Sequence, residues 1–468
     1  MVLLTGCAVG PKYVRPTTQI PAAYKESANW KKAQPQDEMI RGAWWRIFND
    51  PRLDALEAEV NISNQNIAVA QAQFAQSYAL VQAARSSFFP TLGTTASYTR
   101  SHGSSGSGNG SSSNSKNTVS NNLLSADVNW EIDLWGKIRR TMEANSANAQ
   151  ASSADLENAR LSAQAQLAQD YFQLCSLDAQ KKLLDDTETI YQKFFDLTKH
   201  RYTSGVAAQS DVIQAKTQLE AIEAQSIDIG VQRSQLEHAI AVLIGKPASN
   251  FSIPALTQSI FPIPSIPLGI PSQLLERRPD IAAAERTVAA ANALIGVAES
   301  AYYPTLTLSA SGSYQSSNLA NLFSSPNPLW SLGPTLVETI FDAGLRQAQT
   351  AQAKAVYDAD VASYRQTVLT AFQQVEDNLA ALRILEQEAQ VQDTAVKDAR
   401  KAVELETNQY KAGTVSALDV INSQATALTV EKAAVIILGE RMNACVLLIQ
   451  YLGGGWESSE TLKKALDR

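Results

Sequence analysis

The amino-acid sequence predicts a mixed α and β membrane protein with an internal tandem repeat. Three observations support this fold class: long segments with a helical apolar period, short segments in which polar and apolar residues alternate, and a second copy of the same order of segments. The long segments are residues 137–204 and 345–412, which contain neither Gly nor Pro. Helices of that length would extend about 100 Å at 1.5 Å per residue.

The apolar residues of the long segments are spaced as in coiled coils, at steps of three, four and seven. Each segment ends at a turn that contains Gly205 or Gly413, and a second helix returns from that turn. The predicted seams consist of Leu174, Leu177, Leu184, Tyr191 and Phe194 in the first half and of Val361, Tyr364, Val368, Ala371 and Val375 in the second half.

Short motifs reveal the repeat. Residues 88–92, which read Phe-Phe-Pro-Thr-Leu, recur as Tyr-Tyr-Pro-Thr-Leu at residues 302–306, 214 positions later. The turn at residues 202–206 has its counterpart at residues 410–414, 208 positions later, and further pairs keep the spacing of 208. The spacing changes by only six positions, between the two motifs, where the loops differ in length. Matching segments at so regular a spacing indicate a structural duplication, so each half should have the same plan.

Residues 125–134 and 305–311 alternate and predict strands with one polar and one apolar face. In the first strand three acids share the polar parity, while Val, Trp and Ile share the apolar parity. A polar face opposite an apolar face with aromatic residues fits a membrane barrel with a wet lumen. The predicted lumen acids are Asp127, Glu131 and Asp133. Residues 101–118, which are rich in Ser, Gly and Asn, predict a loop in water.

Composition argues against several other protein classes. The net charge of −7 and the pI of about 5.3, without a cluster of Lys and Arg, argue against nucleic-acid binding. The three histidines lack metal-ligand spacing, and no phosphate-binding Gly loop or nucleophile elbow occurs, so we expect no catalysis, metal or cofactor. A purely structural coiled coil would not explain the alternating strands. No uninterrupted run of about 18 apolar residues occurs, so we expect strands to cross the membrane.

The N-terminal segment carries a lipidation signal. Leu4-Thr5-Gly6-Cys7 reads as a bacterial lipobox, and a Pro-rich tether follows between Pro11 and Pro21. Such a box directs a diacylglycerol onto the cysteine, so Cys7 is the predicted lipid anchor. Only six residues precede Cys7, too few for a complete signal peptide, so we expect the natural start to lie further upstream.

Four strands in one chain cannot close a membrane barrel, which needs at least about eight strands. An open sheet in lipid would leave unpaired backbone groups at its edges, so the strands must come from several chains. Two copies would give about eight strands and three would give about twelve. The long helices extend well beyond a bilayer and have a polar face, so they belong in water. A barrel joined to a helical tube describes a conduit.

Several motifs resemble those of a known family. They are Cys7-Ala8-Val9-Gly10-Pro11, Trp44-Trp45, Asp133-Leu134-Trp135-Gly136, Leu275-Glu276-Arg277-Arg278-Pro279-Asp280-Ile281 and Ile340-Phe341-Asp342-Ala343-Gly344. Over nearly its whole length the chain resembles the outer membrane factors of the OprM/NodT lipoprotein branch, relatives of TolC. The resemblance implies a homotrimer with a twelve-stranded β-barrel in the Gram-negative outer membrane, a periplasmic α-barrel and a small equatorial domain.

The same resemblance implies a function and partners. The expected function is the exit duct of a tripartite efflux system, which passively conducts small molecules such as drugs from the periplasm to the cell exterior. The implied partners are a periplasmic adaptor, an inner-membrane transporter of the resistance–nodulation–division class, and outer-membrane lipid. A duct for metal-ion efflux or type I protein secretion is the alternative, although the four Met residues do not cluster as a metal relay would.

In this family the helices close a periplasmic mouth that is lined by acids, and the Gly of each turn gives the register for comparison. The implied gate residues are Leu418, Asp419, Asn422, Tyr410 and Asp211, of which Tyr410 and Asp211 form a tether between neighbouring helices. The implied adaptor-docking tips are Gly205, Val206, Gly413, Thr414, Val415 and Ser416. Val415 stands where some relatives have an Arg that strengthens the closed mouth.

These patterns divide the chain into nine segments. They are 1–50 (lipidated tether and equatorial contact), 51–89 (helix of repeat 1), 90–135 (barrel strands with an extracellular loop at 101–118), 136–248 (helical hairpin with its tip near 203–209), 249–271 (equatorial linker), 272–301 (helix of repeat 2), 302–341 (barrel strands with an extracellular loop at 315–328), 342–452 (helical hairpin with its tip near 411–417) and 453–468 (equatorial tail).

Overall fold

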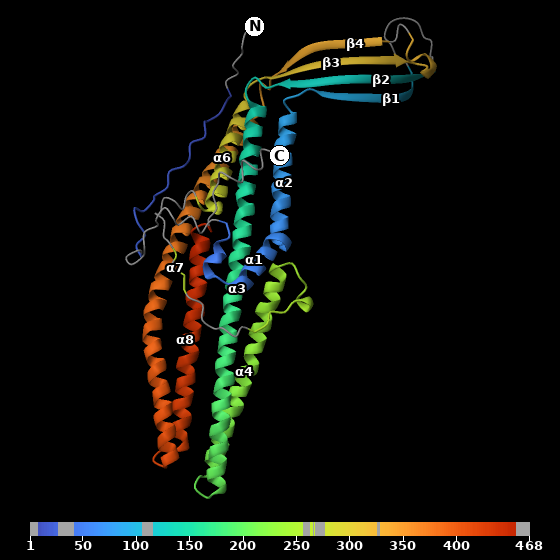
Figure 1. The fold of residues 1–468 in the computed structure, drawn as a ribbon. Coiled ribbons are helices and arrows are strands. Elements are labelled where there is room, and N and C mark those ends of the chain that lie inside the picture. The colour runs from blue at the N-terminus through green and yellow to red at the C-terminus, as the bar shows by residue number, and fades with distance from the viewer. Residues whose placement is uncertain are drawn as a thin grey trace. The chain divides into compact units, whose positions relative to one another are not determined.

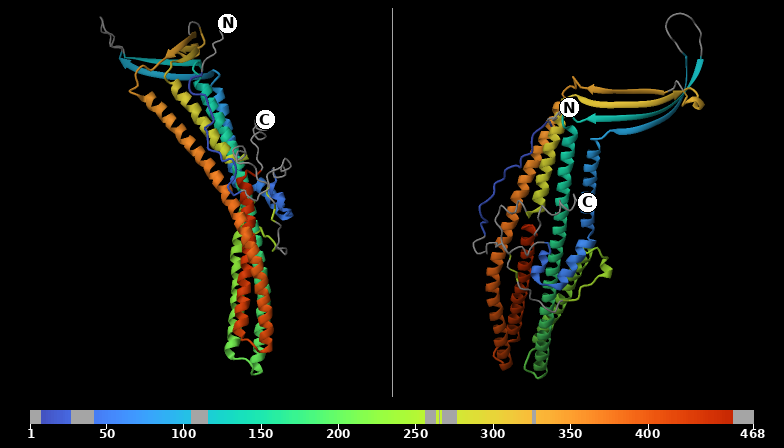
Figure 2. Two further views of the ribbon diagram at one scale, coloured as in Figure 1. Left: turned by 90° about the vertical axis from the view of Figure 1, so that its left-hand side faces the viewer. Right: turned by 45° about the horizontal axis from the view of Figure 1, so that its top comes forward.

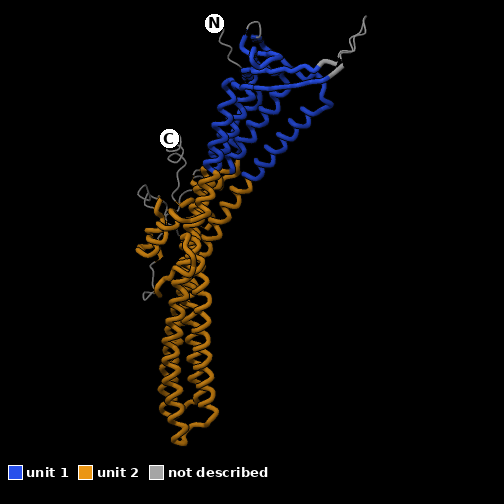
Figure 3. Tube along the Cα trace, turned by 90° about the vertical axis from the view of Figure 1, so that its right-hand side faces the viewer, with its two compact units in different colours: residues 1–17, 74–152, 284–364 blue, residues 18–73, 153–283, 365–468 orange. Residues whose placement is uncertain are grey.

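The computed structural model describes residues 8–26, 42–104, 116–255, 263–264, 266, 277–324 and 328–454. The chain divides into two compact units (Figure 3). Residues 1–17, 74–152 and 284–364 form unit 1, and residues 18–73, 153–283 and 365–468 form unit 2. The predicted lipid anchor Cys7 lies outside the described residues.

Unit 1 contains a four-stranded antiparallel sheet (Figure 1). Its strands are β1 (Thr91–Ser104), β2 (Lys116–Ile132), β3 (Thr305–Ser316) and β4 (Pro328–Val337). They pair in chain order, so β1 and β4 form the two edges of the sheet. The loop predicted at 101–118 is shorter than expected, because β1 and β2 stay paired through its first and last residues. Polar residues are accommodated there since backbone groups, not side chains, form the ladder.

The strand register sorts the side chains onto two faces. Leu92, Val128, Ala310 and Leu332 stand opposite one another on successive strands and therefore share one face. On the other face Ser311 lies opposite Asp127 and Ser331, and the two serine hydroxyl oxygens are 2.8 Å apart. Residues 125–132 and 305–311 of the two segments that the sequence identified as alternating are therefore strands with one apolar and one polar face.

The first predicted helix is two helices. α1 (Pro51–Ser63) and α2 (Gln65–Ser86) are separated by Asn64, whose ψ of 122° lies outside the helical region. The side-chain oxygen of Asn64 accepts hydrogen bonds from the backbone N–H groups of Asn66 (2.9 Å) and Ile67 (3.1 Å), which caps α2. The prediction of one continuous helix was wrong. An Asn that caps the start of a new helix has a non-helical backbone, so it also ends the preceding helix in a segment without Gly or Pro.

The remaining long helices form two hairpins. α3 (Lys137–Thr203) and α4 (Gln209–Leu243) make the first, and α7 (Leu345–Ala412) and α8 (Ala417–Tyr451) make the second. Within unit 2 the hairpins lie side by side (Figures 1 and 2). α6 (Pro279–Ser300) begins at a proline, which suits a first helical turn. The order helix, two strands, hairpin occurs twice, and the hairpin helices begin 208 residues apart.

The core of unit 2 contains the predicted coiled-coil seam of α3. One cluster of buried residues joins α3, α4 and α8; its members are Leu177, Leu184, Tyr191, Leu219, Ile222, Ile229 and Leu428. A second buried group surrounds the 3₁₀ helix η2 (Trp44–Phe48), where Trp44 Nε1 donates a hydrogen bond to Gln164 Oε1 at 3.2 Å. The described residues also include the short 3₁₀ helices η3 (Ala248–Asn250) and η4 (Leu319–Asn321).

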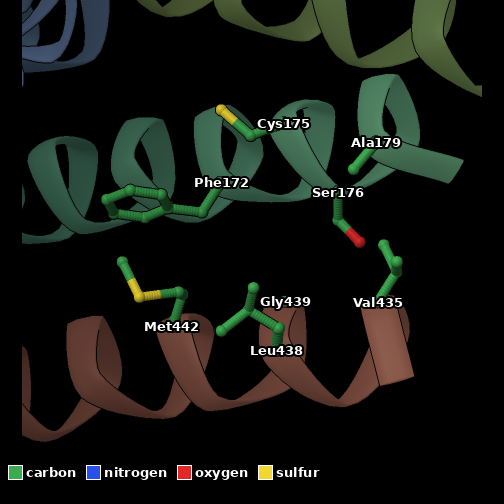
Figure 4. A pocket seen from close by; sticks show the side chains of 8 residues that line it. All are labelled: Phe172, Cys175, Ser176, Ala179, Val435, Leu438, Gly439 and Met442. Carbon is green, nitrogen blue, oxygen red and sulfur yellow. The ribbon is translucent and has the colours of Figure 1, made fainter. Parts of the chain in front are cut away.

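Small residues allow α3 and α8 to approach closely. Figure 4 shows the facing side chains, which are Phe172, Cys175, Ser176 and Ala179 of α3 and Val435, Leu438, Gly439 and Met442 of α8. A Cβ atom on Gly439 would lie 2.9 Å from Ser176 Oγ, so a larger residue would push the helices apart. Cys175 is buried at this crossing, and burial raises the pKa of its thiol.

α6 and α8 are long and apolar enough, by length and composition, to cross a membrane, with mean hydropathies of 1.3 and 1.5 in their most apolar windows. This differs from the expectation that no helix qualifies, because a window average tolerates the charged residues that interrupt an apolar run. Of these windows, 61% in α6 and 39% in α8 is buried inside the protein. Burial of more than half of the window, as in α6, is typical of core helices.

Candidate functional site

The turns at the ends of the two hairpins have the same backbone geometry. We call them tip 1 (residues 203–209) and tip 2 (residues 411–417). Gly205 and Gly413 have φ values of 75° and 79°, in the left-handed region that favours glycine. The residue after each glycine donates its N–H to the carbonyl five positions earlier, at 2.9 Å in tip 1 and 3.0 Å in tip 2. This hydrogen bond is typical of the Schellman motif, which ends a helix.

Tip 2 leads into a capping box at the start of α8. The Asp419 N–H donates to Ser416 Oγ at 3.3 Å, and the Ser416 N–H donates to Asp419 Oδ2 at 2.9 Å. The Ser416 hydroxyl also donates to Asp419 Oδ2 at 2.7 Å. These hydrogen bonds hold the pKa of the exposed Asp419 carboxyl below its usual range, so tip 2 presents a negative charge to solvent.

Tip 1 has only half of this arrangement. Ala208 stands where tip 2 has its capping serine, and its N–H donates to Asp211 Oδ2 at 3.3 Å. The hydroxyl of Tyr410, the implied tether partner of Asp211, lies 3.4 Å from Thr198 Oγ1. Within one chain the structure therefore gives Tyr410 and Asp211 different hydrogen-bond partners.

Tyr410 lies at the centre of a contact between α7 and α3. Its side chain is buried, and its ring centroid is 5.3 Å from that of Phe194. The guanidinium carbon of Arg201 lies 4.4 Å from the Tyr410 ring centroid, and Arg201 Nη1 donates to the Tyr410 carbonyl oxygen at 2.6 Å. A cation–π contact and a charge-assisted hydrogen bond thus act on the same residue. The other buried members of this Tyr410 cluster are Ala215, Ala417, Val420 and Ile421.

Sequence reasoning missed Arg201. It stands in the last turn of α3, where a basic residue is expected simply because it interacts favourably with the helix dipole. Its partner Tyr410 is 209 positions away in the chain. The only available signal was the shared register of the two tips, and this register does not say which face of α3 meets α7.

The other implied gate residues share a surface of α8. Leu418, Asp419 and Asn422 are all exposed in its first turns, where they present an apolar side chain, a carboxylate and an amide to solvent. Residues three and four positions apart lie near one another on a helix surface, so Asn422 neighbours both Asp419 and Leu418. In the part of the chain that the structure describes, no group of three or more His, Cys, Asp or Glu residues could hold a metal ion.

The implied docking residues divide into two groups. Five are exposed at the ends of the hairpins; they are Gly205, Val206, Gly413, Thr414 and Ser416. Val415 is partly buried and packs against the Tyr410 cluster, and Ser416 caps α8. The side chain of Val415 therefore serves tip 2 itself. Ser416 caps α8 and is also exposed, and the other four residues are open to a partner.

The polar face of the sheet carries two of the three predicted lumen acids. Asp127 accepts a hydrogen bond from a serine hydroxyl two residues earlier (2.9 Å), and Glu131 lies 3.1 Å from Lys137 Nζ. Asp133 lies beyond the end of β2 and was wrongly assigned to that strand. Its carboxylate accepts the backbone N–H of Arg139 at 3.0 Å and pairs with Arg139 Nε at 3.1 Å. It therefore caps α3, whose first N–H groups need acceptors.

The chain is similar to known proteins over most of its length. Residues 56–246 and 270–454 match the family model described as outer membrane efflux protein. The chain is 28% identical over 459 residues to the probable efflux pump outer membrane protein TtgC of Pseudomonas putida, covering 97% of this chain and 94% of that protein. It is 30% identical over 421 residues to the pyoverdine export outer membrane protein OpmQ of Pseudomonas aeruginosa, covering 89% and 88% respectively. A solved structure of the outer-membrane channel OprN aligns with a TM-score of 0.88 and 28% identity, covering 96% of this chain and 100% of that chain.

Proposed function

This chain belongs to the outer membrane efflux protein family, and we propose from this premise that it is the gated exit duct of a tripartite efflux system. It is an efflux channel of the Gram-negative outer membrane that extends into the periplasm. Small molecules such as drugs cross it passively, from a periplasmic pump assembly to the cell exterior. The relatives TtgC and OpmQ, named for an efflux pump and for pyoverdine export, support export of small molecules.

The sheet of unit 1 is the observation that carries the proposal. It has one apolar and one polar face, and its two edges are β1 and β4. Lipid offers no hydrogen bonds to edge strands, so the edges must pair with strands of further copies. Three copies supply about twelve strands, enough to close a barrel whose lipid side is apolar and whose lumen is polar. Asp127 and Glu131 then face the lumen.

The start of α8 supplies the gate of the duct. In a homotrimer three copies of Asp419 line one mouth, where they attract cations and repel one another. Leu418 narrows the mouth with apolar atoms, and Asn422 adds a neutral polar group. Tyr410 holds the two hairpins of each chain together, and Asp211 places a further acid at the start of α4.

The exposed ends of the hairpins supply the docking surface for partners. A periplasmic adaptor binds tips 1 and 2 through Gly205, Val206, Gly413, Thr414, Val415 and Ser416, all of which except Val415 are exposed. The adaptor connects the duct to an inner-membrane transporter of the resistance–nodulation–division class. A lipid on Cys7 anchors the chain in the outer membrane.

Single-channel conductance in planar bilayers tests the gated duct. The purified wild-type protein should conduct weakly, because its mouth is closed. The double variant Asp419→Ala with Tyr410→Phe should conduct more, because it loses the carboxylate of the capping box that orders tip 2 and the buried hydroxyl between α7 and α3. Asp398→Ala is the matched control: it removes one exposed carboxylate from α7, away from both tips, and should leave the conductance unchanged.

The possible outcomes test the existence of the channel and the identity of its gate residues independently. Absence of conductance in the wild type and the double variant would contradict the channel itself. Equal conductance in both would leave the channel standing and show that Asp419 and Tyr410 do not control it. An increase in the Asp398→Ala control as well would show that the effect is one of overall charge.

A further inference from the structure

The two tips leave equivalent side chains in different surroundings. Tyr410 and Ile421 in the second hairpin are 3% and 4% exposed. Their counterparts 208 positions earlier, Tyr202 and Ile213, are 42% and 58% exposed. The same two structural positions are therefore covered in one repeat and open to solvent in the other.

Helix α3 of the first repeat covers Tyr410. The covering residues are Phe194 through its ring, Thr198 through its hydroxyl, and Arg201 through its guanidinium. All three lie on one flank of α3, within three turns of tip 1. The equivalent positions of the second repeat, 208 residues later on α7, are Ala402, Glu406 and Gln409.

The equivalent flank of α7 has groups without partners. Glu406 Oε2 is shielded from solvent, and among the described residues it has no hydrogen-bond partner. Beside it, Leu405 is 50% exposed, whereas its counterpart Leu197 packs against the Tyr410 cluster. A shielded carboxylate oxygen without a donor costs free energy. This flank of α7 therefore offers an acceptor and an apolar side chain to a partner that one chain does not supply.

We propose that a second copy of this chain is that partner. Tip 1 of one copy packs against α7 of its neighbour, in a contact that we call the seam between copies. This contact is equivalent to the one between tip 2 and α3 within each chain. Tyr202 and Ile213 then cover Leu405 of the neighbouring copy, and the Tyr202 O–H donates a hydrogen bond to the Glu406 carboxylate of that copy. The inference rests on the proposed homotrimer, because a closed ring alternates first and second repeats and gives every repeat a neighbour on both flanks.

The seam between copies lacks two groups that strengthen the contact within the chain. Ala402 replaces Phe194, so no aromatic ring packs on Tyr202. Gln409 replaces Arg201, so neither a cation–π contact nor a charge-assisted hydrogen bond forms. The three seams between copies are therefore weaker than the three contacts within chains, and the mouth opens first at the seams.

Cross-linking of two cysteine pairs in the full-length channel, in outer-membrane fractions, tests this arrangement. Tyr202→Cys with Glu406→Cys places thiols on both sides of the proposed seam, and a short flexible bismaleimide should join neighbouring copies into covalent dimers and trimers. Thr198→Cys with Tyr410→Cys is the matched control, because these positions face each other within one chain and their product should run as a monomer.

The native thiols should not interfere with this measurement. Cys175 and Cys445 are buried, and burial raises the pKa of both thiols, so neither reacts readily with maleimide. The two single variants, Tyr202→Cys and Glu406→Cys, reveal any product that involves Cys7. Only the complete pair should give dimers and trimers in high yield.

Native mass spectrometry of the same samples separates the possible failures. An intact trimer whose Tyr202→Cys, Glu406→Cys pair gives only monomer-sized product would overturn the inference and leave the proposed assembly standing. Single copies in native mass spectra would overturn the homotrimer and, with it, the seam. Dimers and trimers from the control pair would show that Tyr410 also contacts a neighbouring copy, which contradicts the distinction between the two contacts.

The proposed hydrogen bond has its own test, which leaves the fold undisturbed. Tyr202→Phe removes only the donor, and Glu406→Gln removes only the charge of the acceptor. Tyr202→Phe should raise the open probability of the channel about threefold and Glu406→Gln by no more than that, because Phe removes the hydrogen bond and Gln only weakens it. The double variant should match Tyr202→Phe, because both changes act on the same interaction. Independent effects that multiply in the double variant would show that the two groups do not bind each other.

Discussion

Tip 1 and tip 2 have the same backbone turn, yet their tyrosines have different surroundings. Tyr410 is buried against Phe194 and under Arg201, whereas Tyr202 is largely open to solvent. The glycines of the two turns have nearly equal φ values, so the local chain does not cause the difference. What differs is the flank that each tip meets. A duplicated segment can thus keep its turn while its side chains acquire different roles from their neighbours.

Truncation of the buried tyrosine should have the largest effect. Tyr410→Ala removes a buried ring from the contact between α7 and α3, and large-to-small changes at such sites cost about 3–5 kcal/mol. Hydrogen exchange of the tip 2 amides should report that loss as a lower free energy of local opening. Tyr202→Ala is the matched control on the exposed counterpart and should cost about 1 kcal/mol or less. Equal losses would show that the two tyrosines are equally buried in the assembled protein.

Removal of the guanidinium should have the next largest effect. Arg201→Gln loses the cation–π contact with the Tyr410 ring and the hydrogen bond to the Tyr410 carbonyl, together about 2 kcal/mol. The open probability in planar bilayers should rise. Lys199→Gln removes a positive charge from an exposed position of the same helix and should have no effect. If both variants open the channel alike, then charge in this region matters and the specific contact does not.

Addition of a guanidinium at the weaker seam between copies should lower the open probability instead of raising it. Gln409→Arg places a guanidinium where the proposed seam has none, at the position equivalent to Arg201. A cation–π contact with Tyr202 of the neighbouring copy should stabilise the closed mouth by about 1 kcal/mol and lower the open probability about fivefold. Asn408→Arg, one residue away and exposed, controls for added charge. A higher open probability in Gln409→Arg would mean that the two flanks are not equivalent.

The smallest expected effect concerns pH at tip 2. Hydrogen bonds from Ser416 lower the folded-state pKa of Asp419 below its ordinary value of about 3.9. This cap therefore stabilises α8 above the ordinary pKa, and its contribution is lost as pH falls through the lowered folded-state pKa. Cation selectivity, measured as a reversal potential, should persist to lower pH in the wild type than in Ser416→Ala. Ser416→Thr keeps the hydroxyl and should behave as the wild type does. If cation selectivity is lost at the same pH in all three proteins, then another acid sets the selectivity.

Much of the fold was predictable because it depends on local periodicity. The alternation in residues 125–134 requires two distinct faces, and the structure places residues 125–132 in β2 with that sorting. The segments without Gly or Pro became α3 and α7, and each glycine turn ended its helix. The break at Asn64 was missed, because an Asn inside a helical pattern gives little warning that its side chain will cap a new helix.

The candidate site was predictable only in part. Leu418, Asp419 and Asn422 are exposed together at the start of α8, as expected from their spacing after Gly413. Asp133 was misassigned because strand alternation continues one residue past the end of the ladder, where the carboxylate serves the next helix instead. Arg201 was missed because its contact joins segments that are about 200 residues apart in the chain.

The sequence by itself determined the repeat, the two hairpins with their glycine turns, and the two faces of the strands. These features follow from φ preferences and from side-chain period, which act over a few residues. Only the tertiary structure decided that Tyr410 is buried while Tyr202 is exposed, and that Arg201 rather than Asp211 engages Tyr410. Contacts of that kind depend on which helix flanks meet, and packing between distant segments, not local propensity, sets this choice.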